Sequence, residues 1–260
     1  MAALKGRFPW RLGATSFVIP ADISTNVRQL GGLVDDVQLL FFESAHNSTM
    51  AHEVDVAGLA ELAVAQELSY TVHLPTDIRL GADSAALRQE GRDEILRLID
   101  ELRPLAPGCF DLHLCPEPDL AEADWLAHLD HSLGILAERL GGEKKLVAVE
   151  NIDYPYPLVA ELVAGHGFSS CLDLGHAARY GHDQAAALAR LADNVCHLHY
   201  HGLQGGRDHR ALTDGAAAGV LAENLMASGY EGVVTLELYS LDQLNISMAL
   251  LAEAWQPYRK

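Results

Sequence analysis

The sequence predicts a single α/β domain over residues 1–260, folded as a (β/α)8 barrel, also called a TIM barrel. Short β-like runs alternate with longer amphipathic stretches, and eight such runs are present. Eight strand–helix units in about 250 residues are what this barrel needs. No composition shift and no Pro- or Ser-rich linker divides the chain. An open, doubly wound sheet would also alternate, but neither a GxGxxG nor a P-loop follows the first run.

The elements are predicted in order along the chain. The β-like runs are residues 11–19, 36–43, 69–75, 109–116, 145–152, 168–175, 195–202 and 232–240. Helical patterns are clearest over 84–103 and 119–140, where leucine and isoleucine recur near helical spacing. The Ala- and Leu-rich stretch 210–228 predicts a helix whose start is delayed by Gly215 and Gly219. A last helix is predicted over 241–255, before Pro257.

The composition restricts the partners and the compartment. The chain has 18 Lys+Arg against 36 Asp+Glu, a formal net charge of −18. Nucleic acid is therefore disfavoured as the main partner, because a surface that binds it normally carries a basic excess. The start lacks the apolar core of a signal peptide, and no apolar run approaches transmembrane length. With four cysteines and no CxxC pair, we expect reduced thiols, a cytoplasmic location and no membrane segment.

The stretch VCHLHYHG has histidines at every second position, 197, 199 and 201. Alternate side chains of a strand point to one face, so imidazoles share one face, and Leu198 and Tyr200 lie on the other. Packing does not need three imidazoles in a row, since a buried neutral imidazole must find hydrogen-bond partners. A metal site would use them. The alternative is a satisfied polar strand end, and His197, one layer deeper, is more typical of a core or supporting histidine.

Chemistry in such a barrel lies at the carboxyl ends of the strands. The polar residues read at those ends and in the following loops are almost all potential metal ligands. They are His73, His113, Glu150, Asp173, His176, His199, Asp208, His209 and Glu237. Several carboxylates beside several imidazoles indicate divalent metals, more than one of them. At each position a strand cap, a core side chain or a solvated loop charge is the alternative interpretation.

Further residues at the strand ends are candidates for touching the substrate. Thr15, Ser16 and Glu43 end the first two runs, and His201 lies nearer the rim than His199. Asn151 follows Glu150 and could orient ligands or contact substrate. Guanidinium groups match phosphate oxygens, which makes two arginines candidate phosphate partners, although either could equally form a surface ion pair. They are Arg79 and Arg207.

The order of these residues resembles the xylose-isomerase-like barrel superfamily in its endonuclease IV branch (AP endonuclease family 2), over nearly the whole chain. The resemblance implies phosphodiester hydrolysis with three zinc ions. His73 and His113 would hold the first ion, and Glu150 would bridge the first and second. Asp173, His199 and Glu237 would complete the second, and His176, Asp208 and His209 would hold the third. One departure falls on the third ion: the family has Asp-x-His where Asp208 and His209 are adjacent.

A narrower resemblance begins at the N-terminus. The segment RLGATSFVIPADISTNVRQLGGLVDDVQLLFFES, with YTVHLPTDIRL and HLHYHG followed by RDH, is similar to the cobamide-remodelling phosphodiesterases of the CbiR group. This implies hydrolysis of the phosphoribosyl bond in the nucleotide loop of adenosylated cobamides, giving cobinamide phosphate and an α-riboside. The substrate would be a small corrinoid. The cofactors would be two or three divalent ions, Zn²⁺ or alternatively Mn²⁺, with Glu150 and Glu237 as catalytic residues.

Three alternatives stay open. A sugar isomerase or epimerase of the same barrel would need only Glu150, Asp173, His199 and Glu237 around one divalent ion. An apurinic-site endonuclease would keep all three ions but act on DNA. A non-catalytic carrier would bind a metal or a cobamide without turnover. The oligomeric state is not predicted.

Overall fold

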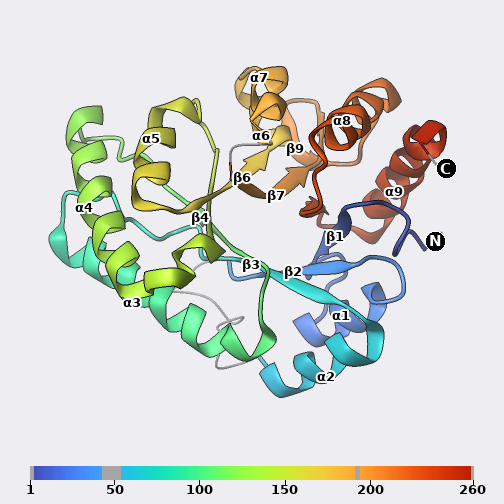
Figure 1. The fold of residues 1–260 in the computed structure, drawn as a ribbon, viewed down its shortest axis with the longest axis horizontal. Coiled ribbons are helices and arrows are strands. Elements are labelled where there is room, and N and C mark those ends of the chain that lie inside the picture. Colours follow the sequence, from blue (N-terminus) through green and yellow to red (C-terminus); the bar gives the residue numbers. More distant parts are fainter. Residues whose placement is uncertain (1–2, 43–53, 191–193, 259–260) are drawn as a thin grey trace.

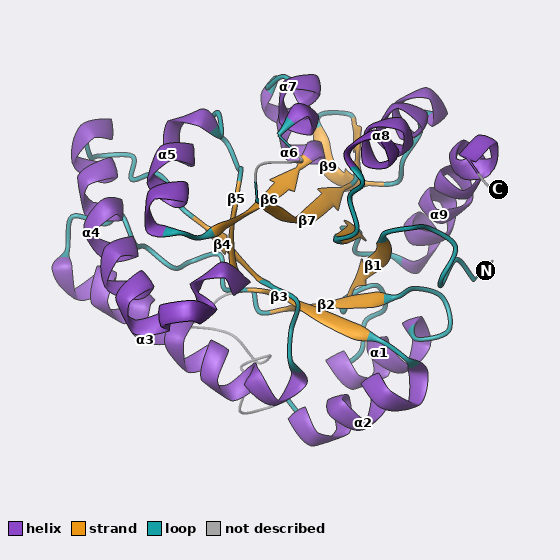
Figure 2. Cartoon of the chain, viewed as in Figure 1, coloured by secondary structure: helices purple, strands orange, loops and turns teal. Residues whose placement is uncertain are grey.

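The computed structural model describes residues 3–42, 54–190 and 194–258. Its strands form a closed parallel barrel in the order β1-β10-β7-β6-β5-β4-β3-β2. The helices surround this barrel, as Figures 1 and 2 show. The predicted (β/α)8 fold is therefore confirmed. Among the described residues, no helix combines the length and the apolar character needed to cross a membrane.

Each predicted β-like run contains one barrel strand. The strands are β1 (Arg11–Thr15), β2 (Asp36–Leu40), β3 (Ser69–His73), β4 (Phe110–His113), β5 (Val147–Glu150), β6 (Ser169–Asp173), β7 (Val195–Tyr200) and β10 (Val233–Leu236). All are shorter than the runs, because apolar character continues into the loops that cover the barrel ends. Leu74 and Leu114, for example, lie beyond β3 and β4 and are buried.

The helices follow the predicted alternation. They are α1 (Ile23–Leu30), α2 (Val56–Gln66), α3 (Ala85–Leu102), α4 (Glu122–Leu140), α5 (Pro157–His166), α6 (Leu174–Tyr180), α7 (Gln184–Ala189), α8 (Gly215–Ser228) and α9 (Leu241–Trp255). Short 3₁₀ turns are η2 (Arg103–Leu105), η3 (Gly141–Leu146) and η4 (Gln256–Tyr258). The helix predicted within 210–228 begins at Gly215. The side chain of Asp214, just before it, accepts hydrogen bonds from the amides of Ala216 and Ala217.

One element was not predicted. The segment after β7, expected to be a loop, forms a two-stranded hairpin of β8 (Gly202–Gln204) and β9 (Arg207–Arg210). Gly205 and Gly206 connect its strands, with φ of 58° and 73°. Two-residue hairpin turns of this kind need positive φ at both positions, which glycine adopts readily. The glycine pair was therefore the signal for the hairpin.

The apolar core lies between the strands and the helices, while the barrel interior below the site is polar. Gln38 donates to Asp111 Oδ2 over 3.0 Å, and His197 joins Asp111 and Thr235 at 2.8 and 2.7 Å. All of these side chains are buried. Because nearly every polar group here has a partner, Gln38 Oε1 being an exception, the interior can be filled by a hydrogen-bonded layer rather than by aliphatic side chains. His197 thus lies under the strand ends in a supporting position.

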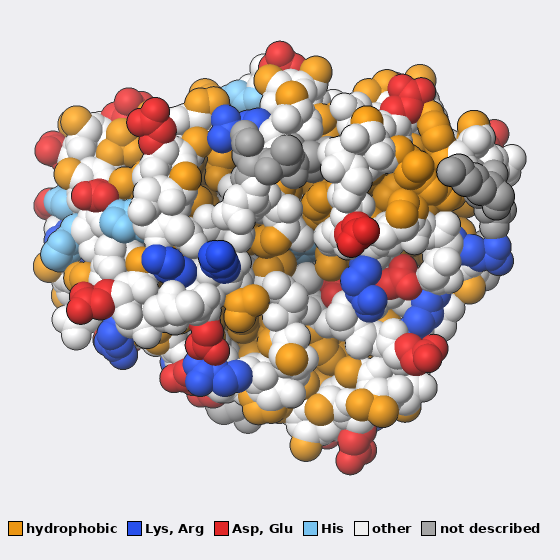
Figure 3. Space-filling model, in the orientation of Figure 1, with side chains coloured by type: hydrophobic (Ala, Val, Ile, Leu, Met, Phe, Trp, Pro, Cys, Tyr) orange, Lys and Arg blue, Asp and Glu red, His pale blue; other side chains and the backbone are white. Residues whose placement is uncertain are grey.

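The surface shows no concentration of positive charge on the face drawn in Figure 3. Lysine and arginine side chains are scattered there among acidic, apolar and uncharged ones. This agrees with the acidic composition.

The seam between β1 and β10 gives a stability prediction. A Cβ at Gly13 would lie 2.6 Å from Thr235 Oγ1 and 3.1 Å from Val233 Cγ1. Gly13→Ala should lower the free energy of unfolding by about 1–3 kcal/mol, the usual cost of overpacking, as measured by urea titration. Gly32→Ala is the matched control, because a Cβ there would meet no atom within 4 Å. Equal stability of the two variants would contradict the tight seam.

Candidate metal centre

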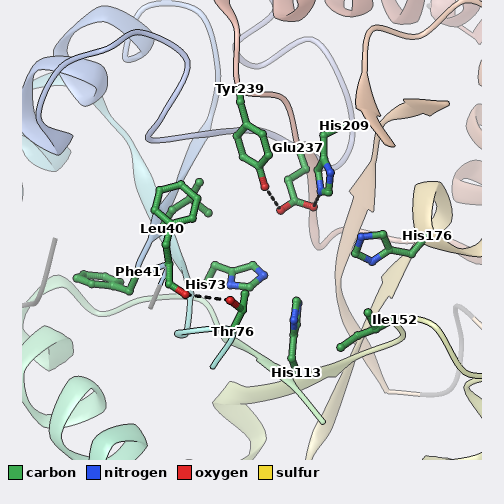
Figure 4. A pocket seen from close by; sticks show the side chains of 11 residues that line it. Leu40, Phe41, His73, Thr76, His113, Ile152, His176, His209, Glu237 and Tyr239 are labelled. Carbon is green, nitrogen blue, oxygen red and sulfur yellow. Dashed lines mark hydrogen bonds and ion pairs between the residues drawn. The ribbon is translucent and has the colours of Figure 1, made fainter. Parts of the chain in front are cut away.

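A cavity of about 180 Å³ opens at the carboxyl ends of the strands. Figure 4 shows imidazoles and the Glu237 carboxylate around it, with Leu40 and Phe41 at one side and Ile152 at the other. Its lining residues are Leu40, Phe41, Phe42, His73, Thr76, His113, Ile152, His176, His209, Glu237 and Tyr239. The position is where (β/α)8 barrels carry their chemistry.

Glu150 is at the centre of the polar side. Its carboxylate is fully buried at the end of β5. Oε2 lies 3.1 Å from His113 Nε2 and 3.5 Å from His73 Nε2. Oε1 lies 3.2 Å from His199 Nδ1 and 3.4 Å from His176 Nδ1. One carboxylate therefore faces two sets of imidazoles, one on each oxygen.

The second set continues toward β10. His199 Nδ1 lies 3.3 Å from Glu237 Oε2 and 3.8 Å from Asp173 Oδ2. Ligand atoms of Glu150, Asp173, His199 and Glu237 all lie within 4.8 Å of one another, and so do those of His73, His113 and Glu150. These two groups share Glu150 and could each hold a divalent ion.

The donor atoms fit such a cation. The buried atoms without a hydrogen-bond partner include Glu150 Oε1, Glu237 Oε2, His176 Nδ1 and His199 Nδ1. An unpartnered buried polar atom is costly, and native structures contain few of them. Here the unpartnered atoms face one another in mixed imidazole and carboxylate sets, which suit Zn²⁺ or Mn²⁺.

A third group lies beside the hairpin. It combines Asp173, His176, His201 and His209, whose ligand atoms also lie within 4.8 Å. Asp208, which the resemblance places among the ligands, is outside this group. Its Oδ2 lies 3.1 Å from Arg179 Nε, and its Oδ1 lies 3.4 Å from His209 Nδ1. His209, at φ 51°, brings its Nε2 to 3.4 Å from Glu237 Oε2.

The hydrogen bonds of His201 limit its role in that group. The amide of His209 donates to His201 Nδ1 over 3.0 Å. A neutral imidazole that accepts at Nδ1 carries its proton on Nε2. Nε2 lies 3.2 Å from Asp173 Oδ2, so His201 donates to that carboxylate. His201 Nε2 is thus already engaged with Asp173, unlike the unpartnered Nδ1 atoms of His176 and His199, and His201 is therefore suited to holding Asp173 in place.

Asp173 is fixed from several other directions. The Asn151 amide group donates to the carbonyl oxygen of Asp173 over 2.9 Å and accepts from its amide over 2.8 Å. Oδ1 of Asp173 accepts from the amide of His176 over 2.7 Å and caps α6. Gly175 leaves the space for the His201 ring, since a Cβ there would lie 2.0 Å from His201 Cε1. Asn151 was expected to contact substrate or orient ligands, and here it holds the backbone of the candidate ligand Asp173.

The mixture of charges changes the pKa values of the cluster. Burial would raise the pKa of Glu150, but the imidazoles of His199 and His113 hold it well below its usual range. Glu237 behaves in the same way beside His199 and His209, and its pKa is also low. Burial lowers the pKa of His176, yet the carboxylates of Asp173 and Glu150 outweigh this and raise it to about 10. The carboxylates are therefore ionised near neutral pH.

The other expected substrate residues lie in varied positions. Thr15 Oγ1 donates to the carbonyl oxygen of Leu238, and Ser16 Oγ accepts from the amide of Leu40. Both are buried, so their hydroxyl groups hold the mouth of the barrel together.

Of the two arginines, Arg79 forms an exposed ion pair with Glu117. This contact corresponds to the ion-pair interpretation of Arg79. Arg207 is exposed at the start of β9. Glu43 lies outside the described residues.

Three residues near the site were not singled out as functional. Tyr239 donates to Glu237 Oε1 over 3.1 Å, and the spacing Glu-x-Tyr at a strand end was the available signal. His199 Nε2 lies 2.8 Å from Gln38 Nε2 and 3.5 Å from Asp111 Oδ2. Asp111 stands two residues before His113, on the same face of β4, but nothing in the sequence shows that β4 reaches His199 across the barrel.

Comparisons with known proteins agree with the fold. The family described as "Xylose isomerase-like TIM barrel" matches residues 25–254. A D-tagatose 3-epimerase-like protein has a TM-score of 0.82 at 18% identity, over 95% of this chain and 97% of that one. AP endonuclease family 2 from Brucella melitensis has a TM-score of 0.73 at 16% identity, over 96% and 99%. The 3-keto-D-glucoside 4-epimerase of E. coli has a TM-score of 0.73 at 16%, over 94% and 98%.

No curated protein matches the sequence significantly. Identities this low show the fold alone.

The role of His201 gives a second prediction. His201→Phe should leave the number of metal ions per chain unchanged but weaken their binding by about 10–100-fold, as loss of a supporting hydrogen bond does. His201→Gln can still donate a hydrogen bond to Asp173, so its metal affinity should fall by less. Metal content by mass spectrometry and competition with a chelator measure the two quantities. Loss of one whole ion from both variants would instead make His201 a ligand.

The raised pKa of His176 gives a third prediction. Below pH 10 this imidazole is protonated in the metal-free protein, and a ligand nitrogen must lose its proton. Zinc binding should therefore release protons, and affinity should increase as the pH rises toward 10. Calorimetric zinc titrations at pH 7.5, in buffers of different ionisation enthalpy, count the protons. His176→Gln should release about one fewer; an unchanged count would contradict the assignment.

Proposed function

Because the chain belongs to the xylose isomerase-like TIM barrel family, we propose that it is a metal-dependent enzyme that hydrolyses phosphodiesters. One observation carries this proposal: ligand groups lie on both sides of Glu150, where a one-metal enzyme needs a single group. A one-metal site has less need for His73 and His113, yet they lie 3.5 and 3.1 Å from the shared carboxylate. Ions that share a bridging carboxylate suit in-line displacement at phosphorus.

The residues would divide among two or three divalent ions, Zn²⁺ or alternatively Mn²⁺. His73 and His113 would hold the first, with Glu150 shared. Asp173, His199 and Glu237 would complete the second. His176 and His209 remain for a third beside Asp173, without Asp208, which pairs with Arg179. The third ion has the fewest ligands, so two ions are the firmer expectation.

The chain's own groups suggest how the reaction proceeds. Bound divalent ions would stabilise negative charge on the phosphoryl oxygens. Glu150 keeps the two ligand sets in fixed relation because its carboxylate is buried and held from both sides. Glu237 is ionised and lies at the cavity wall, so it can accept the proton that an attacking water loses. The Tyr239 hydroxyl holds the other oxygen of Glu237 and sets its orientation.

For the substrate we propose an adenosylated cobamide, cleaved at the phosphoribosyl bond to cobinamide phosphate and an α-riboside. The support is the resemblance of the N-terminal and histidine-rich segments to the CbiR group, together with the acidic composition, which disfavours duplex DNA. Free thiols at Cys109, Cys115, Cys171 and Cys196 fit the proposed cytoplasmic location.

The test combines turnover with metal content. Zinc- or manganese-loaded protein incubated with adenosylated cobamide should yield cobinamide phosphate by mass. His113→Ala should lose one ion per chain, and its activity should fall by on the order of a hundredfold. His166→Ala is the control, since this histidine pairs with Asp130 on the surface. One ion per wild-type chain would refute the hydrolase, and no product at any metal loading would refute the cobamide assignment.

A sugar epimerase or isomerase is the second candidate, and the structural comparisons favour it over the hydrolase, since two of the three similar structures described above are named as epimerases or epimerase-like. The specific observation is that Glu150, Asp173, His199 and Glu237 form a complete one-metal group with two glutamates that could move protons. Protein with one Mn²⁺ should then interconvert D-tagatose and its C3 epimer, detected by chromatography. His113→Ala should retain that activity, the opposite of the result expected for the hydrolase.

A further inference from the structure

The cavity at the strand ends has a wall of aromatic rings, which we call the aromatic wall: Phe17, Phe42 and Tyr239. Phe42 and Tyr239 line the cavity, and Phe17 continues the wall outward. The ring centroids lie 5.1 Å apart for Phe17 and Phe42, 6.3 Å for Phe42 and Tyr239, and 6.5 Å for Phe17 and Tyr239, all edge to face. Phe17 is 43% exposed and Tyr239 39%. Exposed rings that gather at a cavity are a typical ligand-binding feature.

The aromatic wall directly adjoins the candidate ligands. The ring of Tyr239 stacks on that of His209, with centroids 5.0 Å apart and planes inclined by 26°. The Tyr239 hydroxyl also bonds Glu237. A group lying against the wall would therefore be joined to the reacting centre by only a few bonds.

The cavity also offers little to a polyhydroxylated ligand. Apart from candidate metal ligands, the lining side chains are Leu40, Phe41, Phe42, Thr76, Ile152 and Tyr239. Only two of these carry hydroxyl groups, and both already donate: Thr76 to the carbonyl oxygen of Phe42, and Tyr239 to Glu237. No lysine or arginine is among the lining residues that the structure describes. Sugar hydroxyls left without partners would lose binding energy.

We propose that the aromatic wall binds a planar aromatic group of the substrate, attached close to the phosphodiester. The inference rests on the proposed hydrolase and narrows its substrates to phosphodiesters with an aromatic substituent. The phosphate would be bound at the metal ligands, and the aromatic group would lie against Phe17 and Phe42.

The experiment measures binding and does not need turnover. Zinc-loaded protein is titrated calorimetrically with diphenyl phosphate and with diethyl phosphate, which carry the same charge. The wild type should bind diphenyl phosphate about tenfold more tightly. Phe17→Ala and Phe42→Ala should each weaken the binding of diphenyl phosphate by about two- to tenfold, the range of an aromatic pair. The affinity for diethyl phosphate should stay unchanged. Tyr239→Phe keeps the ring and should keep the preference.

Tyr258→Ala is the control, since this tyrosine bonds Glu223 away from the barrel mouth. Unchanged diethyl phosphate affinity shows that a variant is folded and loaded, and Phe17→Leu provides a second, milder variant. Equal wild-type binding of the two diesters, no binding of diphenyl phosphate, or a preference that survives both alanine variants would overturn the proposal. If the preference holds while cobamide is not hydrolysed, only the proposed function fails. Hydrolysis without the preference refutes the aromatic wall alone.

Discussion

The site depends on one buried carboxylate. Glu150 has no exposed surface, and an isolated charge in that position would be strongly unfavourable. Four imidazoles within 3.5 Å stabilise it. These imidazoles come from four different elements, β3, β4, α6 and β7, so several strand–helix units must come together to supply them. Only closure of the sheet brings these groups to one axis, and the stability of the barrel and the assembly of the site are therefore linked.

Strand register explains how the closure works in detail. His113 and Glu150 are partners across β4 and β5, and Asp173 and His199 are partners across β6 and β7. Thr235, two residues before Glu237, is the partner of His199 on β10. A shift of one residue in any of these pairs would turn the ligands out of the interior. The buried network of Asp111, His197 and Thr235 adds hydrogen bonds that favour this register.

The fold and most of the converging residues could be predicted because both depend on local sequence. Alternation within a strand placed His199 inward, and the position of Glu150 after an apolar run placed it at a strand end. Contacts across the barrel could not be predicted in this way, which is why Gln38 and Asp111 were not connected with His199. The place of Asp208 outside the third group depends on the hairpin, whose glycine turn reverses the chain and leaves Asp208 paired with Arg179.

The hairpin has a further consequence for how the site exchanges its contents. Glu150, Glu237 and His199 are placed by the closed barrel, whereas His209 is placed by two short strands, β8 and β9, that form a separate two-stranded sheet. Local opening of this hairpin would withdraw His209 and also remove the amide that holds His201, while the barrel stays closed. Such local openings require much less free energy than global unfolding. An ion beside the hairpin would therefore exchange with solution faster than the ions at Glu150, giving one site two different residence times.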